Sequence, residues 1–313
     1  MRPLLYLSAL LLATLFAVGL DWAFEHYKTR PAAEPVVGDP RLSIRPAAHL
    51  ARRAVRNFRA LPIDEQQALR EQLTAVTSTL DAWAREQADS ASVLCLGERH
   101  EDSTRTFIAN EILPRIDYQV LMLETSQAQL QTILVEYGKG RPVTLLNASV
   151  GEVLRATMAR TPAVKIIAID ENQLANSSIR TLPDREIALV ARIREEWRQG
   201  QRHAVLFGAL HCRAEPGWML HQLPQNDSRI RRAGIMGAVV LARYREAGAQ
   251  VLMYLLEEIG FGDEILVVSK VSKFPKLIAQ WLPITADAFA GYDSAILFDD
   301  RTARRSIRRT SPQ

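Results

Sequence analysis

The sequence predicts an α/β fold with a mainly parallel sheet flanked by helices, preceded by an N-terminal membrane-anchor helix and a helical lead-in. From residue 91 onward, short β-branched apolar runs alternate with amphipathic stretches, which is typical of βαβ units. The runs are apolar throughout rather than at every second position, as in strands that are covered on both faces. The 313 residues, 48% hydrophobic and 24% charged, are enough for one sizeable core.

The first 22 residues are predicted to be a signal anchor. Arg2 is followed by 18 uncharged residues, 3–20, a length just sufficient to cross a bilayer. No clear A-x-A cleavage site follows, so an uncleaved anchor is favoured over a cleaved signal peptide. No cysteine precedes Cys95, which argues against a lipoprotein. We therefore expect the membrane to be a partner, with the domain on the extracytoplasmic (periplasmic) side of a bacterial inner membrane.

Residues 31–47 carry four prolines and one glycine and are predicted to be a linker. Residues 48–88 show helical periodicity in two pieces that divide near Leu61 and Pro62, with Asp64 as the expected N-cap of the second. This lead-in is expected either to pack on the main domain or to hold it above the membrane.

The α/β domain is predicted to span residues 91–299, followed by a disordered basic tail at 300–313. Helices are expected between the first four strands, at about 103–114, 125–137, 150–160 and 184–199. The predicted strands are 92–97, 119–124, 164–170, 203–208, 250–256, 264–269 and 294–299.

The net charge of +4 hides a segregation of charge. Residues 41–60 hold six arginines and residues 301–309 hold five, with no acid in either segment. Solvated helix and tail charges are one explanation, and contact with anionic lipid is the other. Nucleic acid is not an expected partner, because no aromatic residues interleave with the C-terminal arginines to stack on bases.

Cys95 and Cys212 are the two cysteines of the chain, too few for a disulfide framework or a four-cysteine zinc site. Buried structural thiols are favoured over a bond between them, although neighbouring strands would let them approach.

Polar residues follow the apolar runs at the points where the predicted strands end. Glu98 and His100 follow the first strand, Glu124 ends the second, Asp170 ends the third and His211 follows the fourth. In a parallel sheet these ends meet at one edge, where ligands bind. Imidazoles and carboxylates together suit a divalent metal ion, or a histidine base oriented by a carboxylate.

Two of these segments share a Gly-x-x-His pattern, Gly97 to His100 and Gly208 to His211, in which the glycine lets the chain turn sharply out of the strand. Ordinary structural roles remain open for each residue. His100 would then be a loop histidine, Glu124 a charge at a helix N-terminus and Asp170 a helix N-cap, the last being the most readily explained in this way. His26, His49, His203 and His221 are not expected to belong to a site.

Five segments, LGERHEDSTRTFIANEIL, VLMLETSQAQL, IIAIDENQ, LPDREIALVARI and VLFGALH, together resemble the TIKI/TraB/PrgY, erythromycin esterase and ChaN superfamily. The resemblance covers roughly residues 91–299 and is strongest to the ChaN-like, haem-binding-uptake branch. It implies that Glu98, His100, Glu124 and His211 match the polar cluster of the superfamily. It also implies that Arg185 matches an arginine that opens a later helix.

The superfamily uses this cluster in several ways: TIKI-like members are metal-dependent proteases, erythromycin esterase-like members use a histidine base, and ChaN is associated with haem. The resemblance therefore implies a hydrolase, either an esterase or a peptidase. Its catalytic residues would be Glu98, His100, Glu124, Arg185 and His211, and all of these except Arg185 would bind a divalent metal such as Mn, Co or Zn.

The alternative is a haem or iron-ligand binding protein of the ChaN type without catalysis, for which Tyr244, Tyr254 and Tyr292 are candidate axial ligands. A non-catalytic accessory protein is the third hypothesis, and the complete Glu and His set argues against it. This chain differs from ChaN because it lacks the lipoprotein cysteine. It differs from the long erythromycin esterases in the size of its helical insertion. The substrate, a small molecule or a peptide, is not predicted.

Overall fold

The computed structural model describes most of the chain from residue 53 onward, and these residues belong to one compact unit, Pro46–Gln313. The predicted anchor, linker and tail lie outside the described residues. No helix in the described part of the chain is long and apolar enough to cross a membrane. The described residues are 53, 55–171, 182–197, 200–223, 229–237, 256, 260, 265–278 and 289–298.

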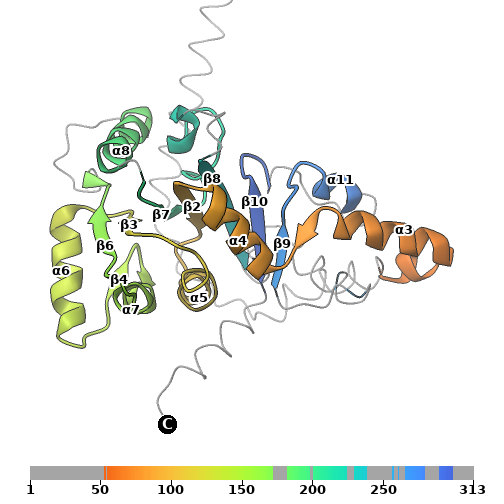
Figure 1. Ribbon diagram of the computed structural model, residues 1–313, viewed down its shortest axis with the longest axis horizontal. Helices are drawn as coiled ribbons and strands as arrows, with labels where there is room; N and C mark the ends of the chain where they lie inside the picture. The colour runs from red at the N-terminus through yellow and green to blue at the C-terminus, as the bar shows by residue number, and fades with distance from the viewer. Residues whose placement is uncertain are drawn as a thin grey trace, which may run out of the picture. The chain divides into compact units, whose positions relative to one another are not determined.

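The core of the fold is an eight-stranded sheet with the order β1-β9-β10-β8-β2-β7-β3-β6 (Figure 1). The run from β10 to β6 is parallel, whereas β9 pairs antiparallel with both β10 and β1. The strands are β1 (Thr77–Ser78), β2 (Val93–Glu98), β3 (Val120–Leu123), β6 (Lys165–Ala168), β7 (His203–Gly208), β8 (Ile230–Gly237), β9 (Ile265–Val268) and β10 (Ser294–Phe298).

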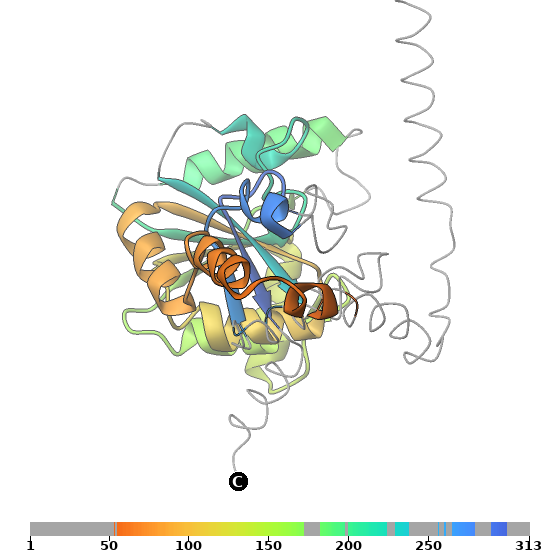
Figure 2. The ribbon, with the colours of Figure 1, turned by 90° about the vertical axis from the view of Figure 1, so that its right-hand side faces the viewer.

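Helices cover both faces of the sheet, and the core divides into two apolar clusters accordingly (Figure 2). One face packs against α4 (Leu80–Ser90), α5 (Asp102–Phe107), the π-helical turn η1 (Ile108–Ile112), α6 (Gln127–Gly138) and α7 (Gly151–Met158). The other face packs against α3 (Ile63–Thr74), α8 (Leu182–Glu196), the 3-10 turn η3 (Met219–Gln222) and α11 (Phe274–Ile278). A short hairpin, β4 (Thr144–Leu145) with β5 (Ala148–Ser149), precedes α7. The predicted class, a mainly parallel α/β sheet flanked by helices, is confirmed.

The buried strands explain why this sheet was predictable. Every residue of β2, β3 and β7 is buried, so the sequence of each strand is a continuous apolar run. Two strands of this sheet were not predicted, the two-residue β1 and the arginine-containing β8, and the hairpin strands β4 and β5 were not predicted either. Of the strand predicted over 250–256, all but the last residue lie outside the described residues, and Leu256 is helical.

The helical lead-in packs on the sheet and contributes to it. The side chain of Trp83 on α4 is buried, and its indole Nε1 donates a hydrogen bond to the Ser294 hydroxyl on β10 (2.9 Å). The predicted N-cap, Asp64, was wrong: α3 begins at Ile63, so Asp64 lies in the first turn of the helix, where its negative charge interacts favourably with the helix dipole. Pro62 occupies the N-cap position and has no side-chain acceptor.

The prediction of two buried free thiols was also wrong. Cys95 and Cys212 form a disulfide, with their Cα atoms 5.6 Å apart. Cys95 lies within β2, and the chain after β7 folds back across β2 so that Cys212 reaches it. Both cysteines are buried, as predicted, but the bond depends on a loop path that the spacing of the cysteines does not encode.

Candidate functional site

The candidate site lies at the carboxyl ends of four neighbouring strands, β2, β7, β3 and β6. The connections that follow β2 and β3 run over one face of the sheet, whereas α8, which leads back from β6 to β7, lies on the other face. Ligands in parallel α/β sheets bind where successive connections diverge in this way. All five predicted site residues, Glu98, His100, Glu124, Arg185 and His211, meet at this edge.

Glu98 ends β2 and is held by a buried arginine that was not predicted. The Nε of Arg105 on α5 donates to Glu98 Oε1 (2.9 Å) and Oε2 (3.1 Å), and Nη1 donates to the backbone oxygens of Leu145 and Ala148 (2.6 and 2.8 Å). These bonds neutralise a carboxylate that has almost no exposed surface. They also fix the loop that carries His100.

His100 is oriented by Glu98. Its Nδ1 lies 3.2 Å from Glu98 Oε1, and its Nε2 lies 3.5 Å from Glu124 Oε2. The Nη2 of Arg105 also lies 3.3 Å from Nδ1. We assign the ring proton to Nδ1, so that Nδ1 donates to Glu98. The carboxylate of Glu98 is a stronger acceptor than a ring nitrogen, and Arg105 already donates to that carboxylate and does not need Nδ1 as an acceptor. This assignment leaves the lone pair of Nε2 directed away from Glu98.

Glu124 follows β3 and lies at the centre of the cluster. Its Oε2 accepts a hydrogen bond from the Gly208 backbone N–H (2.7 Å), which ties the ends of β3 and β7 together. Its Oε1 accepts from Arg185 Nη2 (2.8 Å) and lies 3.5 Å from His211 Nε2. The two oxygens of one carboxylate therefore face the Nε2 atoms of two different histidines.

Gly208 provides the space in which these side chains meet. A Cβ atom at this position would lie 3.0 Å from His100 Nε2, 3.3 Å from Glu124 Oε2 and 3.4 Å from His211 Cδ2. Any larger residue would crowd the cluster. Glycine is therefore required at this position, because the three side chains lie so close to its Cα. The first glycine, Gly97, is similarly close to Ala209 and Cys212.

Arg185, in the first turns of α8, connects three groups of the cluster. Nη2 binds Asp170 Oδ2 (2.5 Å) and Glu124 Oε1, and Nε lies 3.4 Å from Asp170 Oδ1. Nη1 donates to His211 Nε2 (3.2 Å). Burial lowers the pKa of Arg185, but the bonds and charge of Asp170, and then of Glu124, raise it above its ordinary value. Asp170 is therefore the fully buried counter-ion of Arg185.

His211 has a carboxylate partner of its own, which was not predicted. Its Nδ1 lies 2.8 Å from Glu186 Oε1 and 3.0 Å from Oε2, and Glu186 has no exposed surface. Because Nε2 accepts from Arg185, the ring proton lies on Nδ1 and is donated to Glu186. The rings of Phe207 and Trp218 make edge contacts with the imidazole, at 5.4 and 5.6 Å between centroids. His211 is thus fixed from four sides.

The members of the cluster differ in how far solvent reaches them. The His100 side chain is 32% exposed and Arg185 23%, whereas His211 is 10% and Glu124 6% exposed. An incoming molecule therefore meets His100 and Arg185 first. The bonds to Asp170, Glu124 and His211 use four of the five guanidinium N–H groups, so one N–H on Nη1 has no acceptor among the described residues.

The donor set was tested against the two predicted cofactors. No group of three or more His, Cys, Asp or Glu side chains in the described part of the chain is arranged to hold a metal ion. Guanidinium groups lie where a cation would bind, since Arg185 contacts both Glu124 and His211. As arranged, the cluster fits an arginine better than a divalent metal. Mn, Co or Zn binding stays a prediction.

Haem also fits poorly, because an axial ligand should lie in an apolar surface. His100 is surrounded by carboxylates and a guanidinium instead. Tyr292 is buried, and its hydroxyl donates to the Ala209 backbone oxygen (2.6 Å). Tyr244 and Tyr254 lie outside the described residues.

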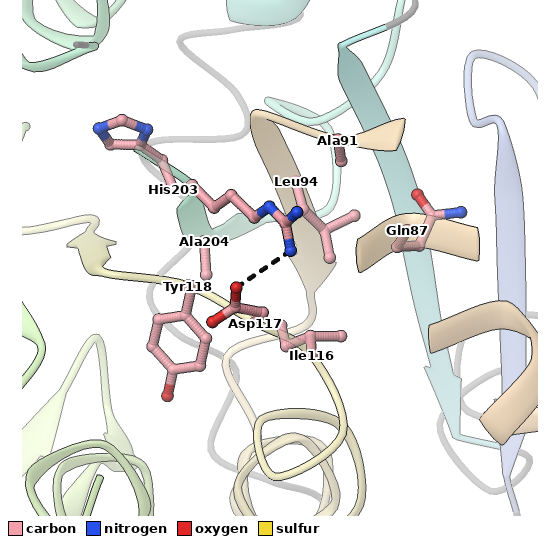
Figure 3. A pocket seen from close by; sticks show the side chains of 9 residues that line it. Gln87, Ala91, Leu94, Ile116, Asp117, Tyr118, His203 and Ala204 are labelled. Atoms are coloured by element: carbon pink, nitrogen blue, oxygen red, sulfur yellow. Dashed lines mark hydrogen bonds and ion pairs between the residues drawn. The ribbon is translucent and has the colours of Figure 1, made fainter. Parts of the chain in front are cut away.

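A small hollow of about 10 Å³ lies at the opposite edge of the sheet, where β2 and β7 begin (Figure 3). Gln87, Leu94, Tyr118 and His203 are among its lining residues, and Figure 3 shows the imidazole of His203 turned away from it. It has room for about one water molecule and is separate from the cluster. His203 packs as predicted, with Nε2 3.1 Å from the Glu196 backbone oxygen, and burial lowers its pKa.

Fold and site together define a mainly parallel α/β protein with a His, Glu and Arg cluster at the carboxyl edge of its sheet. Comparison with protein-family models, curated proteins and solved structures finds no match. The resemblance to the TIKI, erythromycin esterase and ChaN superfamily therefore depends on the motifs quoted above.

Proposed function

We propose that the protein is a membrane-anchored, extracytoplasmic hydrolase of the ChaN/TIKI/erythromycin-esterase type, in which His100 acts as a general base. The observation that carries the proposal is the geometry at His100: Glu98 Oε1 lies 3.2 Å from Nδ1, and 32% of the side chain is exposed to solvent. With the ring proton assigned to Nδ1, Nε2 is the atom that can accept a proton. Arg185 binds the neighbouring Glu124 and supplies a guanidinium to the same cluster. A histidine oriented by a carboxylate is the usual way in which proteins activate water near neutral pH.

In the proposed reaction, His100 Nε2 removes a proton from a water molecule as the water attacks the carbonyl carbon of an ester or amide. Glu98 holds the ring, and Glu124 Oε2, 3.5 Å from Nε2, stabilises the imidazolium that forms. The proton then passes from Nε2 to the leaving group.

Arg185 would stabilise the negative charge that develops on the carbonyl oxygen. Its remaining Nη1 N–H is the available donor, and its other four N–H groups hold the guanidinium rigidly against Asp170, Glu124 and His211. His211, fixed by Glu186, would thereby orient the guanidinium and would not itself bind water. No step of this proposal requires a metal ion.

The disulfide supports the proposed location outside the cytoplasm. Stable disulfides form in oxidising compartments and are rare in the cytosol. The bond between Cys95 and Cys212 agrees with the anchor predicted over residues 1–22, which would place the domain on the periplasmic side of the inner membrane.

Hydrolysis of p-nitrophenyl esters and of a fluorogenic peptide by the full chain in detergent, with EDTA present, tests the proposal. We expect His100→Gln to lower kcat/KM by about 10²- to 10⁴-fold. His221→Gln is the matched control, because His221 lies on η3 and contacts the Ala214 backbone oxygen (3.3 Å), outside the cluster. Equal rates for the two variants would contradict the role of His100, and loss of wild-type activity in EDTA would favour the metal hypothesis.

A further inference from the structure

The chain segment that follows β7 carries His211 and folds back over the end of β2. A Cβ atom on Gly97 would lie 3.2 Å from each of three atoms, Ala209 Cα, Cys212 Cβ and Tyr292 Cε1. The segment 209–213 therefore lies directly on the strand that ends in Glu98. Because the segment has no regular secondary structure beyond turns, its position must be fixed by contacts with other parts of the chain.

Two of these contacts flank His211 on either side along the chain. Cys212 is bonded to Cys95, 117 residues earlier in the sequence. Ala209 accepts a hydrogen bond at its backbone oxygen from the Tyr292 hydroxyl (2.6 Å). His211 thus lies between a covalent attachment to β2 and a hydrogen bond from Tyr292, which lies two residues before β10.

The surroundings of Tyr292 keep its hydroxyl in place as a donor. Its ring lies against Gly97 and Gly234, where added Cβ atoms would be 3.2 and 3.0 Å away, so only glycines leave room for it. Burial raises the pKa of Tyr292, and the guanidinium of Arg213, 5.4 Å from the ring centre, lowers it less strongly. The hydroxyl is therefore protonated at neutral pH and donates to Ala209.

We propose that Tyr292 and the Cys95–Cys212 disulfide form a clamp that positions His211, and through it Arg185, for the hydrolysis proposed above. His211 Nε2 must stay 3.2 Å from Arg185 Nη1 for the guanidinium to keep its orientation. A shift of the segment would turn the imidazole away from Glu186 and release that donor. Both cysteines have no exposed surface, so the disulfide is inaccessible to thiol exchange in the folded state and acts as a permanent attachment.

The clamp is tested with two variants of the full chain, Tyr292→Phe and Cys95→Ala/Cys212→Ala. Tyr292→Phe keeps the ring against the glycines and removes only the hydroxyl, so it remains informative if the cysteine variant does not fold. We expect amide hydrogen exchange in the segment 209–213 to accelerate by about tenfold in Tyr292→Phe, as for the loss of one hydrogen bond, and by more in the cysteine variant.

A second readout follows the imidazole itself. The His211 Nδ1 proton, bonded to Glu186, should give a downfield proton NMR signal that broadens in both variants. Val267→Ala is the control, because Val267 is buried in β9 among other apolar residues and away from the segment. Exchange and signal are compared at equal fractions of the urea midpoint, so that global stability does not account for the difference.

The outcomes separate the clamp from the proposed function. Unchanged exchange and an unchanged Nδ1 signal in both variants, or equal changes in Val267→Ala, would overturn the clamp whether or not the protein hydrolyses any probe. A loosened segment together with wild-type kcat/KM would also overturn it, since positioning would then be irrelevant to the reaction. A loosened segment in a protein whose wild type hydrolyses no probe would leave the clamp standing and contradict the hydrolase.

Discussion

Replacing Arg185 by methionine tests whether one guanidinium holds the buried carboxylates of the site together. Methionine has a similar length and no charge, so Arg185→Met removes the bonds at 2.5 Å to Asp170 and 2.8 Å to Glu124. Asp170 has no exposed surface and Glu124 very little, so water cannot replace the lost donor. Both carboxylates would lose their guanidinium partner in the interior, although Glu124 would keep the hydrogen bond from the Gly208 N–H.

The expected cost is large compared with that of an ordinary surface ion pair. Breaking a buried pair by removing one partner destabilises by about 3–5 kcal/mol, out of a total free energy of unfolding of roughly 5–15 kcal/mol. The matched control is Arg155→Met, which breaks a pair with Glu152 on α7 (2.6 Å), in which both side chains are well exposed, and an exposed hydrogen bond to Asn110 (3.0 Å). That pair should contribute about 0–1 kcal/mol.

Urea unfolding followed by circular dichroism gives the free energy of unfolding of each variant by linear extrapolation. Adding Asp170→Asn to Arg185→Met should recover part of the loss, because an uncharged amide is less costly to bury than an unpaired carboxylate. If Arg185→Met costs no more than Arg155→Met, the guanidinium does not stabilise these carboxylates. The pairing described here would then be wrong.

Two further predictions concern a close approach and a buried histidine. Gly208→Ala would place a Cβ 3.0 Å from His100 Nε2 and should lower kcat/KM about 10- to 100-fold. Gly151→Ala is the control and should leave kcat/KM unchanged, because its Cβ would have its nearest neighbour at 3.9 Å. Equal activities of the two variants would show that a Cβ at position 208 does not disturb the site. Burial lowers the pKa of His203 below its usual value near 6.5, so the unfolded chain binds the proton more readily and stability falls as the pH drops below about 6.5. In urea unfolding at several pH values, His203→Gln should reduce this fall, and parallel curves for the two proteins would contradict it.

The sheet was predictable where burial on both faces leaves a continuous apolar run, as in β2, β3 and β7. In β8 the pattern fails because of Arg231 and Arg232. The second of these is buried, and its backbone and guanidinium N–H groups bind Asp293 (2.8 and 3.3 Å). A charged residue that finds its partner 61 positions away leaves no periodic signal in the strand itself.

The same reason explains which site residues were missed. Glu98, His100, Glu124 and His211 come at or after the ends of strands, a position that the sequence marks. Arg105 and Glu186 lie on helices, where charged residues are usually exposed, and their burial depends on partners from other elements. One signal was available for Glu186, which directly follows Arg185 in the segment LPDREIALVARI.

The disulfide was predicted least well, because its formation depends on the path of the loop that carries Cys212. Cys95 lies in a strand and Cys212 after a neighbouring one, which allows contact without requiring it. The segment 209–213 must first fold back over Gly97, and the absence of a side chain there is what permits this. The pairing thus follows from a close backbone approach that spacing alone does not reveal.

The protonation state of His100 is the most direct test of the proposed general base. In nitrogen NMR of the protein labelled with ¹⁵N-histidine, the His100 signals can be assigned by their absence in His100→Gln. The proposal predicts a proton on Nδ1, bonded to Glu98, and an unprotonated Nε2 at neutral pH with EDTA present. A proton on Nε2, directed at Glu124, would leave no base facing the solvent and would contradict the account.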